Sequence, residues 1–173
     1  MDESNSSAHA NLAFPYVFTR EFDKAIEVAE KGVSLSPNSA SGYFALGFAL
    51  VFAGRSQEAI PILQKCLRLS PVPIRSQVLG LLASSYTGLA QYEEAVVAGK
   101  KMRQIHGPDH LTAHIWLACA NIGLGRENEA RAEATEILRI DPKFTVEQYV
   151  KNLPVSPAGK DRMTKALLKT GLH

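Results

Sequence analysis

Apolar residues recur along this chain at spacings of three and four, in segments of about a dozen residues that polar turns separate. This spacing places the apolar side chains on one face of a helix. In one pair of segments, Tyr43 and Leu46 mark a first helix, a turn follows at Gly54, and Ala59 and Leu63 mark a second helix. No pattern typical of a strand is visible, so the sequence predicts an all-α protein.

The helices form a repeat of 34 to 36 residues. Each copy of the repeat contains one marker alanine, and a proline follows about twelve residues later. A polar or acidic stretch precedes each alanine. A unit of this length cannot bury its own apolar face, so such units stack on their neighbours and form a solenoid. The markers are Ala25, Ala59, Ala95 and Ala130, with Pro37, Pro71, Pro108 and Pro142.

This pattern resembles the tetratricopeptide repeat, a helix-turn-helix of about 34 residues. The resemblance implies an all-α, right-handed α-solenoid of about four helix-turn-helix repeats, followed by two C-terminal capping helices. We expect a polar N-terminal extension at residues 1–5, the solenoid at 6–142 and the capping helices at 145–173. The four repeats are expected at residues 6–39, 40–73, 76–109 and 111–144.

Three local departures from the repeat should change its geometry. Pro15 lies inside the first helix of repeat one, where a proline kinks or loosens a helix. Two extra residues precede repeat three, within Pro71–Ile74, and should alter the step between repeats two and three. The closing proline of repeat three, Pro108, also comes one place late.

The segment after the repeats predicts two more helices. Thr145 and Gln148 have the spacing of a capping box, which opens a short helix to about Leu153. After Pro154, a second helix begins with Ser156 as its cap. Its apolar stripe is Met163, Ala166, Leu167 and Leu168. Two interpretations stay open: a terminal cap that shields the last repeat, or a segment that docks into the concave groove and regulates access to it.

Short phrases of the chain carry a more particular resemblance. Arg68–Pro71, Leu138–Glu147 and Asp161–Leu172 are similar to the C-terminal repeat region of certain bacterial proteins. In those proteins a class III adenylate/guanylate cyclase domain, or a winged-helix DNA-binding domain, precedes the repeats. The resemblance implies that this chain is the non-catalytic part of a larger cyclase or regulator, because no cyclase catalytic pattern occurs in it.

The tetratricopeptide resemblance also implies which residues face a partner. In that architecture the first helix of each repeat lines the concave groove. Carried onto this chain, the partner-binding residues are predicted to be Phe14, Phe18, Phe44, Phe48, Phe52, Leu81, Ser84 and Trp116. This surface is aromatic and nearly uncharged. Family members that bind a partner's carboxylate use lysine, arginine and asparagine at such positions, and this chain has only Asn11. The alternative is that the rings pack against neighbouring second helices as core.

Composition and charge limit the remaining classes. A net charge of +2 favours neither nucleic acid nor an anionic membrane as a partner. The N-terminus is polar and acidic, unlike a signal peptide, and the longest apolar run, Gly42–Gly54, is too short to span a bilayer. Two cysteines, Cys66 and Cys119, fall in different repeats, so no disulfide is expected and a cytoplasmic location is predicted.

No set of residues predicts catalysis, a cofactor or a metal site. His106, His110 and His114 are spaced by four, as metal ligands on one helix can be, but Gly107–Pro108 interrupts that helix. The cysteines have no histidine at a catalytic spacing, and no glycine-rich phosphate loop occurs. The chain is therefore predicted to be no enzyme.

The sequence thus predicts a scaffold that binds a protein or peptide partner. The partner segment would be helical or extended and apolar, and would lie in the concave groove. The partner could instead be a second copy of the chain, bound through the apolar groove or the terminal helices. The alternative function is the regulatory C-terminal region of a bacterial adenylate/guanylate cyclase.

Overall fold

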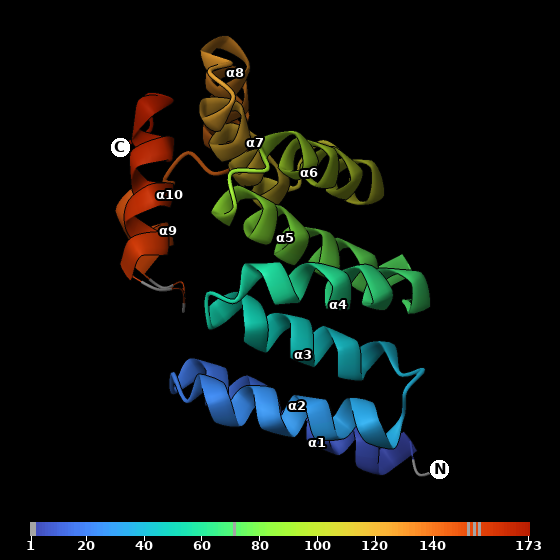
Figure 1. The fold of residues 1–173 in the computed structure, drawn as a ribbon. Helices are drawn as coiled ribbons and strands as arrows, with labels where there is room; N and C mark the ends of the chain where they lie inside the picture. The colour runs from blue at the N-terminus through green and yellow to red at the C-terminus, as the bar shows by residue number, and fades with distance from the viewer. Residues whose placement is uncertain (1–2, 71, 152, 154, 156) are drawn as a thin grey trace. The chain divides into compact units, whose positions relative to one another are not determined.

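The structure is a computed structural model, which describes residues 3–70, 72–151, 153, 155 and 157–173. Over these residues the regular structure is ten α-helices, and no strand occurs among them (Figure 1). The predicted all-α class is therefore confirmed. The helices are α1 (Glu3–Phe18), α2 (Phe22–Leu35), α3 (Ala40–Phe52), α4 (Ser56–Leu69), α5 (Val72–Gly88), α6 (Tyr92–His106), α7 (Leu111–Gly123), α8 (Glu127–Ile140), α9 (Val146–Lys151) and α10 (Pro157–Lys169).

The chain divides into two compact units, Met1–Leu82 and Ala83–His173, and the division falls inside α5. In the first unit, α1 packs against α2 and α3, and α3 packs against α4. In the second unit, α7 packs against α6 and α8, and α10 packs against α7 and α9. Each unit therefore consists of antiparallel helix pairs stacked on one another, as the repeat pattern predicts.

The marker alanines lie inside this stack. Ala25, Ala59, Ala95 and Ala130 are each fully buried. The first helices carry a second series of small residues, and Ala13, Ala83 and Ala118 of that series are fully buried as well. Close approach also explains Gly99 in α6, because a Cβ atom there would lie 2.9 Å from Leu117 Cγ.

The same turn joins the first helix to the second in every repeat. One residue of each turn adopts a left-handed conformation, and the N–H of the next residue donates to a carbonyl five positions earlier, as from Gln91 to Tyr86 (2.9 Å). Glycine adopts this conformation freely, whereas a residue with a side chain costs about 1 kcal/mol there. The φ angles are 64° at Arg20, 79° at Gly54, 59° at Ala90 and 72° at Gly125.

The ends of the chain differ in part from expectation. The first helix begins at Glu3, so residues 3–5 of the predicted extension are helical, whereas Met1 and Asp2 lie outside the described residues. The first helix continues through Pro15 to Phe18. The extra residues before repeat three belong partly to α5, which has 17 residues against 13 in α3 and α7. Their effect on the step between repeats stays a prediction.

In the C-terminal segment, the amide of Gln148 donates to Thr145 Oγ1 (3.3 Å), so this half of the capping box is confirmed. Helix α9 extends over Val146–Lys151, and its predicted end at about Leu153 follows residue 152, which lies outside the described residues, as do Pro154 and Ser156. Leu168 was wrongly placed in the apolar stripe of α10, because it is 49% exposed while Leu167 is fully buried. Adjacent residues on a helix point about 100° apart, so Leu168 lies on the side of α10 away from Met163 and Leu167.

The turn of repeat three generates the first prediction. Replacing Ala90 by glycine should raise the free energy of unfolding of the second unit by about 1 kcal/mol, because glycine relieves the left-handed strain. Denaturation in urea, followed through the fluorescence of Trp116 in that unit, measures the change. Ala132→Gly in α8 is the matched control, and should lower stability by about 0.5–1 kcal/mol. A loss of stability in both variants would contradict the strain.

Candidate functional site

Five phenylalanines from two helices of the first unit lie together in one cluster. Helix α1 contributes Phe14 and Phe18, and α3 contributes Phe44, Phe48 and Phe52. The spacing of four places the rings of each helix on one stripe, and the packing of α1 against α3 brings the two stripes together. We call these five residues the phenylalanine cluster.

Phe48 is the centre of the phenylalanine cluster. Its ring centroid lies 4.4 Å from Phe52, 5.1 Å from Phe14, 6.2 Å from Phe44 and 6.3 Å from Phe18. The contacts with Phe52 and Phe14 are edge-to-face, an arrangement that aromatic rings favour. The rings therefore shield one another in part, and loss of the central ring would leave the other four without their common contact.

The phenylalanine cluster reaches the surface. Phe18 is 66% exposed, and the other four rings are half-buried. Leu12 in the same helix is 50% exposed, although the residues at the equivalent position of the other repeats, Leu46, Leu82 and Leu117, are buried. No sequence signal separates Leu12 from its buried equivalents, because exposure here depends on what stacks beside repeat one.

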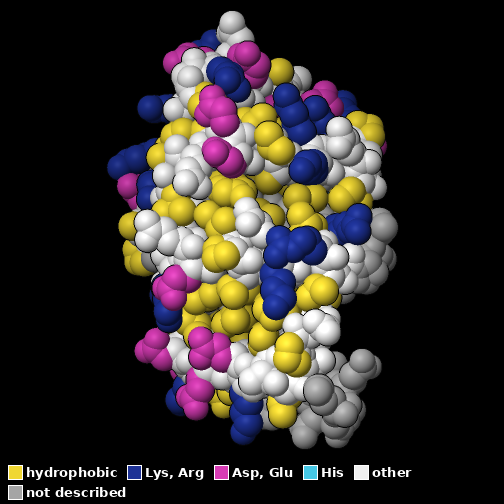
Figure 2. Space-filling model, turned by 45° about the vertical axis from the view of Figure 1, so that its right-hand side comes forward, with side chains coloured by type: hydrophobic (Ala, Val, Ile, Leu, Met, Phe, Trp, Pro, Cys, Tyr) yellow, Lys and Arg dark blue, Asp and Glu magenta, His cyan; other side chains and the backbone are white. Residues whose placement is uncertain are grey.

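The helices that carry the phenylalanine cluster supply almost no charge around it. Helix α3 contains no charged residue, and α1 contains none between Asn11 and Phe18. Figure 2 shows hydrophobic side chains on the face that it presents, with lysine and arginine interspersed among aspartate and glutamate. The cluster is therefore suited to apolar contact and not to the capture of a charged group.

The other three predicted residues lie on α5 and α7. Leu81 is half-buried in the part of α5 that belongs to the first unit, whereas Ser84 and Trp116 belong to the second unit. Trp116 in α7 is half-buried and packs against a cluster that α7, α8, α9 and α10 form together. We call this second group the terminal cluster; its buried members include Ile115, Cys119, Phe144, Val150, Met163 and Leu167.

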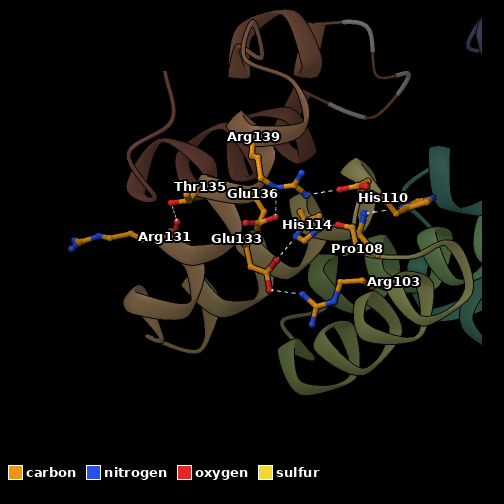
Figure 3. Close-up of polar contacts among 11 residues, drawn as sticks. Arg103, Pro108, His110, His114, Arg131, Glu133, Thr135, Glu136 and Arg139 are labelled. Atoms are coloured by element: carbon orange, nitrogen blue, oxygen red, sulfur yellow. Dashed lines mark hydrogen bonds and ion pairs between the residues drawn. The ribbon is translucent and has the colours of Figure 1, made fainter.

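The histidines that suggested a metal site are engaged in other contacts (Figure 3). His114 is buried, with Nδ1 2.5 Å from Glu133 Oε2 and Nε2 2.6 Å from the carbonyl oxygen of Pro108. His110 Nδ1 accepts a hydrogen bond from the Ala113 amide, and its ring lies 4.8 Å from that of His106. Burial, with a contribution from His106, lowers the pKa of His110. In the described part of the chain, no three His, Cys, Asp or Glu side chains form a group that could hold a metal ion.

Glu133 extends these contacts into a bridge among three helices. Its Oε1 lies 3.4 Å from Arg103 Nη1 of α6, and its Oε2 contacts His114 of α7, while Glu133 itself belongs to α8. In Figure 3 the Arg103, His114 and Glu133 side chains converge between these helices. The three side chains therefore link α6, α7 and α8 by polar contacts.

The cysteines are poor nucleophiles in this fold. Both are free and buried. Burial raises the pKa of the Cys66 thiol, and it raises the pKa of Cys119 to about 12. The thiolate is the reactive form of cysteine, so neither side chain is activated for catalysis.

The length and apolar character of the helices decide whether any of them could cross a membrane. Among the helices as described, none has both the length and the apolar character that crossing a membrane requires.

Stacked helix pairs with one buried alanine and one common turn define a tetratricopeptide-repeat protein. A family model described as tetratricopeptide repeat matches residues 6–39, 40–73 and 111–144. These segments make up more than half of the chain, which belongs to the tetratricopeptide repeat family. The model describes a repeat and no catalytic domain.

Solved structures with the same fold include several of MamA. A crystal structure of MamA protein is 25% identical, with a TM-score of 0.70, over 88% of this chain and 80% of that chain. MamA from residue 41 onward, of Desulfovibrio magneticus RS-1, is 19% identical, with a TM-score of 0.71, over 79% and 76% of the two chains. MamA MSR-1 is 22% identical, with a TM-score of 0.69, over 83% and 79%. The likeness confirms the tetratricopeptide-type solenoid.

No curated protein sequence matches this chain. Neither the family model nor the MamA structures are described as a cyclase, so the resemblance to a cyclase-associated repeat region stays a prediction.

The geometry of the phenylalanine cluster generates a prediction about stability. Phe48→Ala should lower the free energy of unfolding of the first unit by about 2–3 kcal/mol, because it removes the half-buried central ring. Phe18→Ala should cost less than about 1 kcal/mol, since that ring is mostly exposed. Urea denaturation followed by far-ultraviolet circular dichroism compares the two variants. Equal losses would show that Phe48 is not the centre of the cluster.

A separate prediction concerns His114. His114→Phe keeps an aromatic ring but removes the contacts of His114 with the Pro108 carbonyl and with Glu133 Oε2, and leaves Glu133 only Arg103. The second unit should lose about 1–3 kcal/mol of stability, measured by urea denaturation through Trp116 fluorescence. His106→Phe, at an exposed neighbouring position, is the control and should change stability by less than about 0.5 kcal/mol. An unchanged midpoint for His114→Phe would exclude the structural role.

Proposed function

We propose that this chain is a scaffold whose phenylalanine cluster binds an apolar segment of a protein or peptide partner. The observation that carries the proposal is the position of Phe18, two-thirds exposed at the edge of five rings that contact one another. Apolar area gains about 25 cal/mol per Å² when it leaves water. A contiguous aromatic surface of this kind is typical of an interaction site.

The class of fold supports this proposal. Tetratricopeptide-type solenoids stack repeats in one dimension and so present extended surfaces. In the first unit, α1 and α3 are first helices of their repeats, and they pack directly against each other. The phenylalanine cluster therefore spans two successive repeats, which gives a partner segment a continuous surface in place of isolated side chains.

The chemistry of the surface limits the partner. A partner that presents a carboxylate needs lysine, arginine or amide side chains, and the helix faces around the cluster offer only Asn11. An amphipathic helix, or an extended segment with apolar residues, needs only apolar pockets and exclusion of water. We therefore assign the cluster to a segment with leucine-like or aromatic side chains.

The compartment and the alternative function complete the proposal. The unpaired, buried cysteines support a reducing compartment such as the cytoplasm. The alternative function, as a regulatory region of an adenylate/guanylate cyclase, rests on the sequence resemblance, and no contact among the described residues favours it.

Binding of two designed peptides tests the proposed function. Both are fluorescent 15-residue peptides of one composition, with leucines at helical spacing in the first and at alternate positions in the second. The full chain should bind one of them, and Phe18→Ser with Phe52→Ser should weaken that binding about tenfold or more, as loss of buried rings implies. Fluorescence anisotropy measures the dissociation constants. The identity of the bound peptide distinguishes a helical from an extended partner.

The matched control is Val97→Ser, at a residue of α6 that is 51% exposed and lies outside the phenylalanine cluster. It should leave binding unchanged. Sedimentation velocity on the same proteins reveals whether a second copy is the partner, in which case the double variant becomes monomeric. Absence of both peptide binding and self-association would refute the proposal, as would binding that survives the loss of both rings.

A further inference from the structure

The C-terminal segment, residues 145–173, covers one face of α7. Helix α10 packs against α7 and α9, as Figure 1 also shows for this end of the chain. Its buried residues Met163 and Leu167, with Ala166 beside them, belong to the terminal cluster. Val146 and Val150 of α9 belong to it as well. Apolar contact thus joins the C-terminal segment to the last repeat.

The covered face is the one that lines the groove in this family of folds. Ile115, Trp116 and Cys119 occupy the α7 positions that correspond to Phe44, Ala45 and Phe48 of α3 in the repeat alignment. Ile115 is fully buried and Cys119 is 2% exposed, whereas Phe44 and Phe48 are only half-buried. Two of the three equivalent positions are therefore partly open to solvent in repeat two and buried in the terminal cluster in repeat four, whereas Ala45 is fully buried and Trp116 is half-buried.

A directed polar contact accompanies the apolar one. Arg162 Nη1 donates to the carbonyl oxygen of Gly88 (3.2 Å), the last residue of α5. The carboxyl end of a helix carries partial negative charge, which a guanidinium group complements. Arg162 of α10 thus contacts α5, the first helix of repeat three, while the apolar stripe of α10 contacts α7, the first helix of repeat four.

The C-terminal segment has the character of a separate ligand. The repeat match ends at residue 144, so the fourth repeat is complete without it. The segment closes on itself, since Lys160 Nζ donates to the Lys151 carbonyl (2.6 Å) and the Val146 amide donates to the His173 carbonyl (2.9 Å). Its outer face is polar and includes the Asp161–Lys165 ion pair (2.7 Å).

We propose that the C-terminal segment is a releasable internal ligand of the groove-lining face of repeat four. When it leaves, the same face binds a partner helix with the chemistry of α10: two apolar residues four positions apart, with an arginine directly before the first. The face that recognises such a helix is the one formed by Ile115, Trp116 and Cys119, with the carboxyl end of α5 beside it. This site is distinct from the phenylalanine cluster and does not depend on its function.

The native Cys119 thiol reports release of the segment, because it is buried in the terminal cluster. The substitution Val96→Cys provides a reference thiol in the same unit, since Val96 belongs to a separate buried cluster with Leu117 and Ala120. In the full chain, a thiol reagent should modify Cys119 at least about tenfold faster than the reference thiol, as expected for local opening without unfolding of the unit. Peptide mapping by mass spectrometry follows each cysteine separately.

Two variants in α10 and one control sharpen this measurement. Leu167→Ser and Arg162→Glu should speed modification of Cys119 further while leaving the rate at the reference thiol unchanged. Leu168→Ser, at the adjacent exposed residue, should change neither rate. If Leu167→Ser speeds both reactions because the unit unfolds, Arg162→Glu decides, since Arg162 is exposed and contributes nothing to the buried core. Equal rates for Cys119 and the reference thiol in every protein would overturn the proposal and make the segment a permanent cap.

A peptide of residues 145–173 tests the second half of the proposal. Added to the Leu167→Ser chain, the peptide should slow modification of Cys119 to near the rate in the unsubstituted chain. The same peptide carrying both Arg162→Glu and Leu167→Ser should give no protection. If Cys119 is modified early but the unsubstituted peptide never protects it, the face opens without accepting such a helix, and the proposal fails.

Discussion

The close approach of successive helices is the constraint on which this structure depends. A helix pair of this length exposes an apolar face that it cannot cover alone, so each pair is stable only against its neighbours. The marker alanines of the second helices, and the small residues of the first helices, let the helices approach until larger side chains interlock. Ala25, Ala59, Ala95 and Ala130 are fully buried, so all four repeats meet this constraint. Other positions differ between the repeats.

Those differences concentrate on the groove-lining face of the first helices. In repeats one and two the face carries phenylalanines that shield one another only in part. In repeat four the equivalent positions carry Ile115 and Cys119, and the C-terminal segment closes over them. One backbone arrangement thus supports two surfaces, one left partly open and one already occupied. Function in such a protein resides in side chains that the packing of the stack does not constrain.

The sequence predicted what depends on local spacing and missed what depends on neighbours. The helices, the turns and the buried alanines follow from an apolar spacing of three to four residues and a repeat length of about 35 residues. Both patterns recur in every repeat. The spacing of four also predicted that Phe14 and Phe18 share a stripe. It could not predict the exposure of Leu12, because that depends on what stacks beside the first repeat. Nor could it decide whether the C-terminal segment covers α7, since that segment occurs once and no repeat provides a register for it.

The left-handed turn residue has a further consequence for the stack as a linear array. Repeats two and four have glycine at this position, whereas repeats one and three have Arg20 and Ala90, which hold the same conformation at a cost of about 1 kcal/mol each. Intrinsic stability therefore alternates along the chain. Repeat three, an interior repeat, also contains the division between the two compact units, inside α5. In a linear array such a cost lowers the stability of the repeat that bears it, so heating should open repeats one and three before repeats two and four.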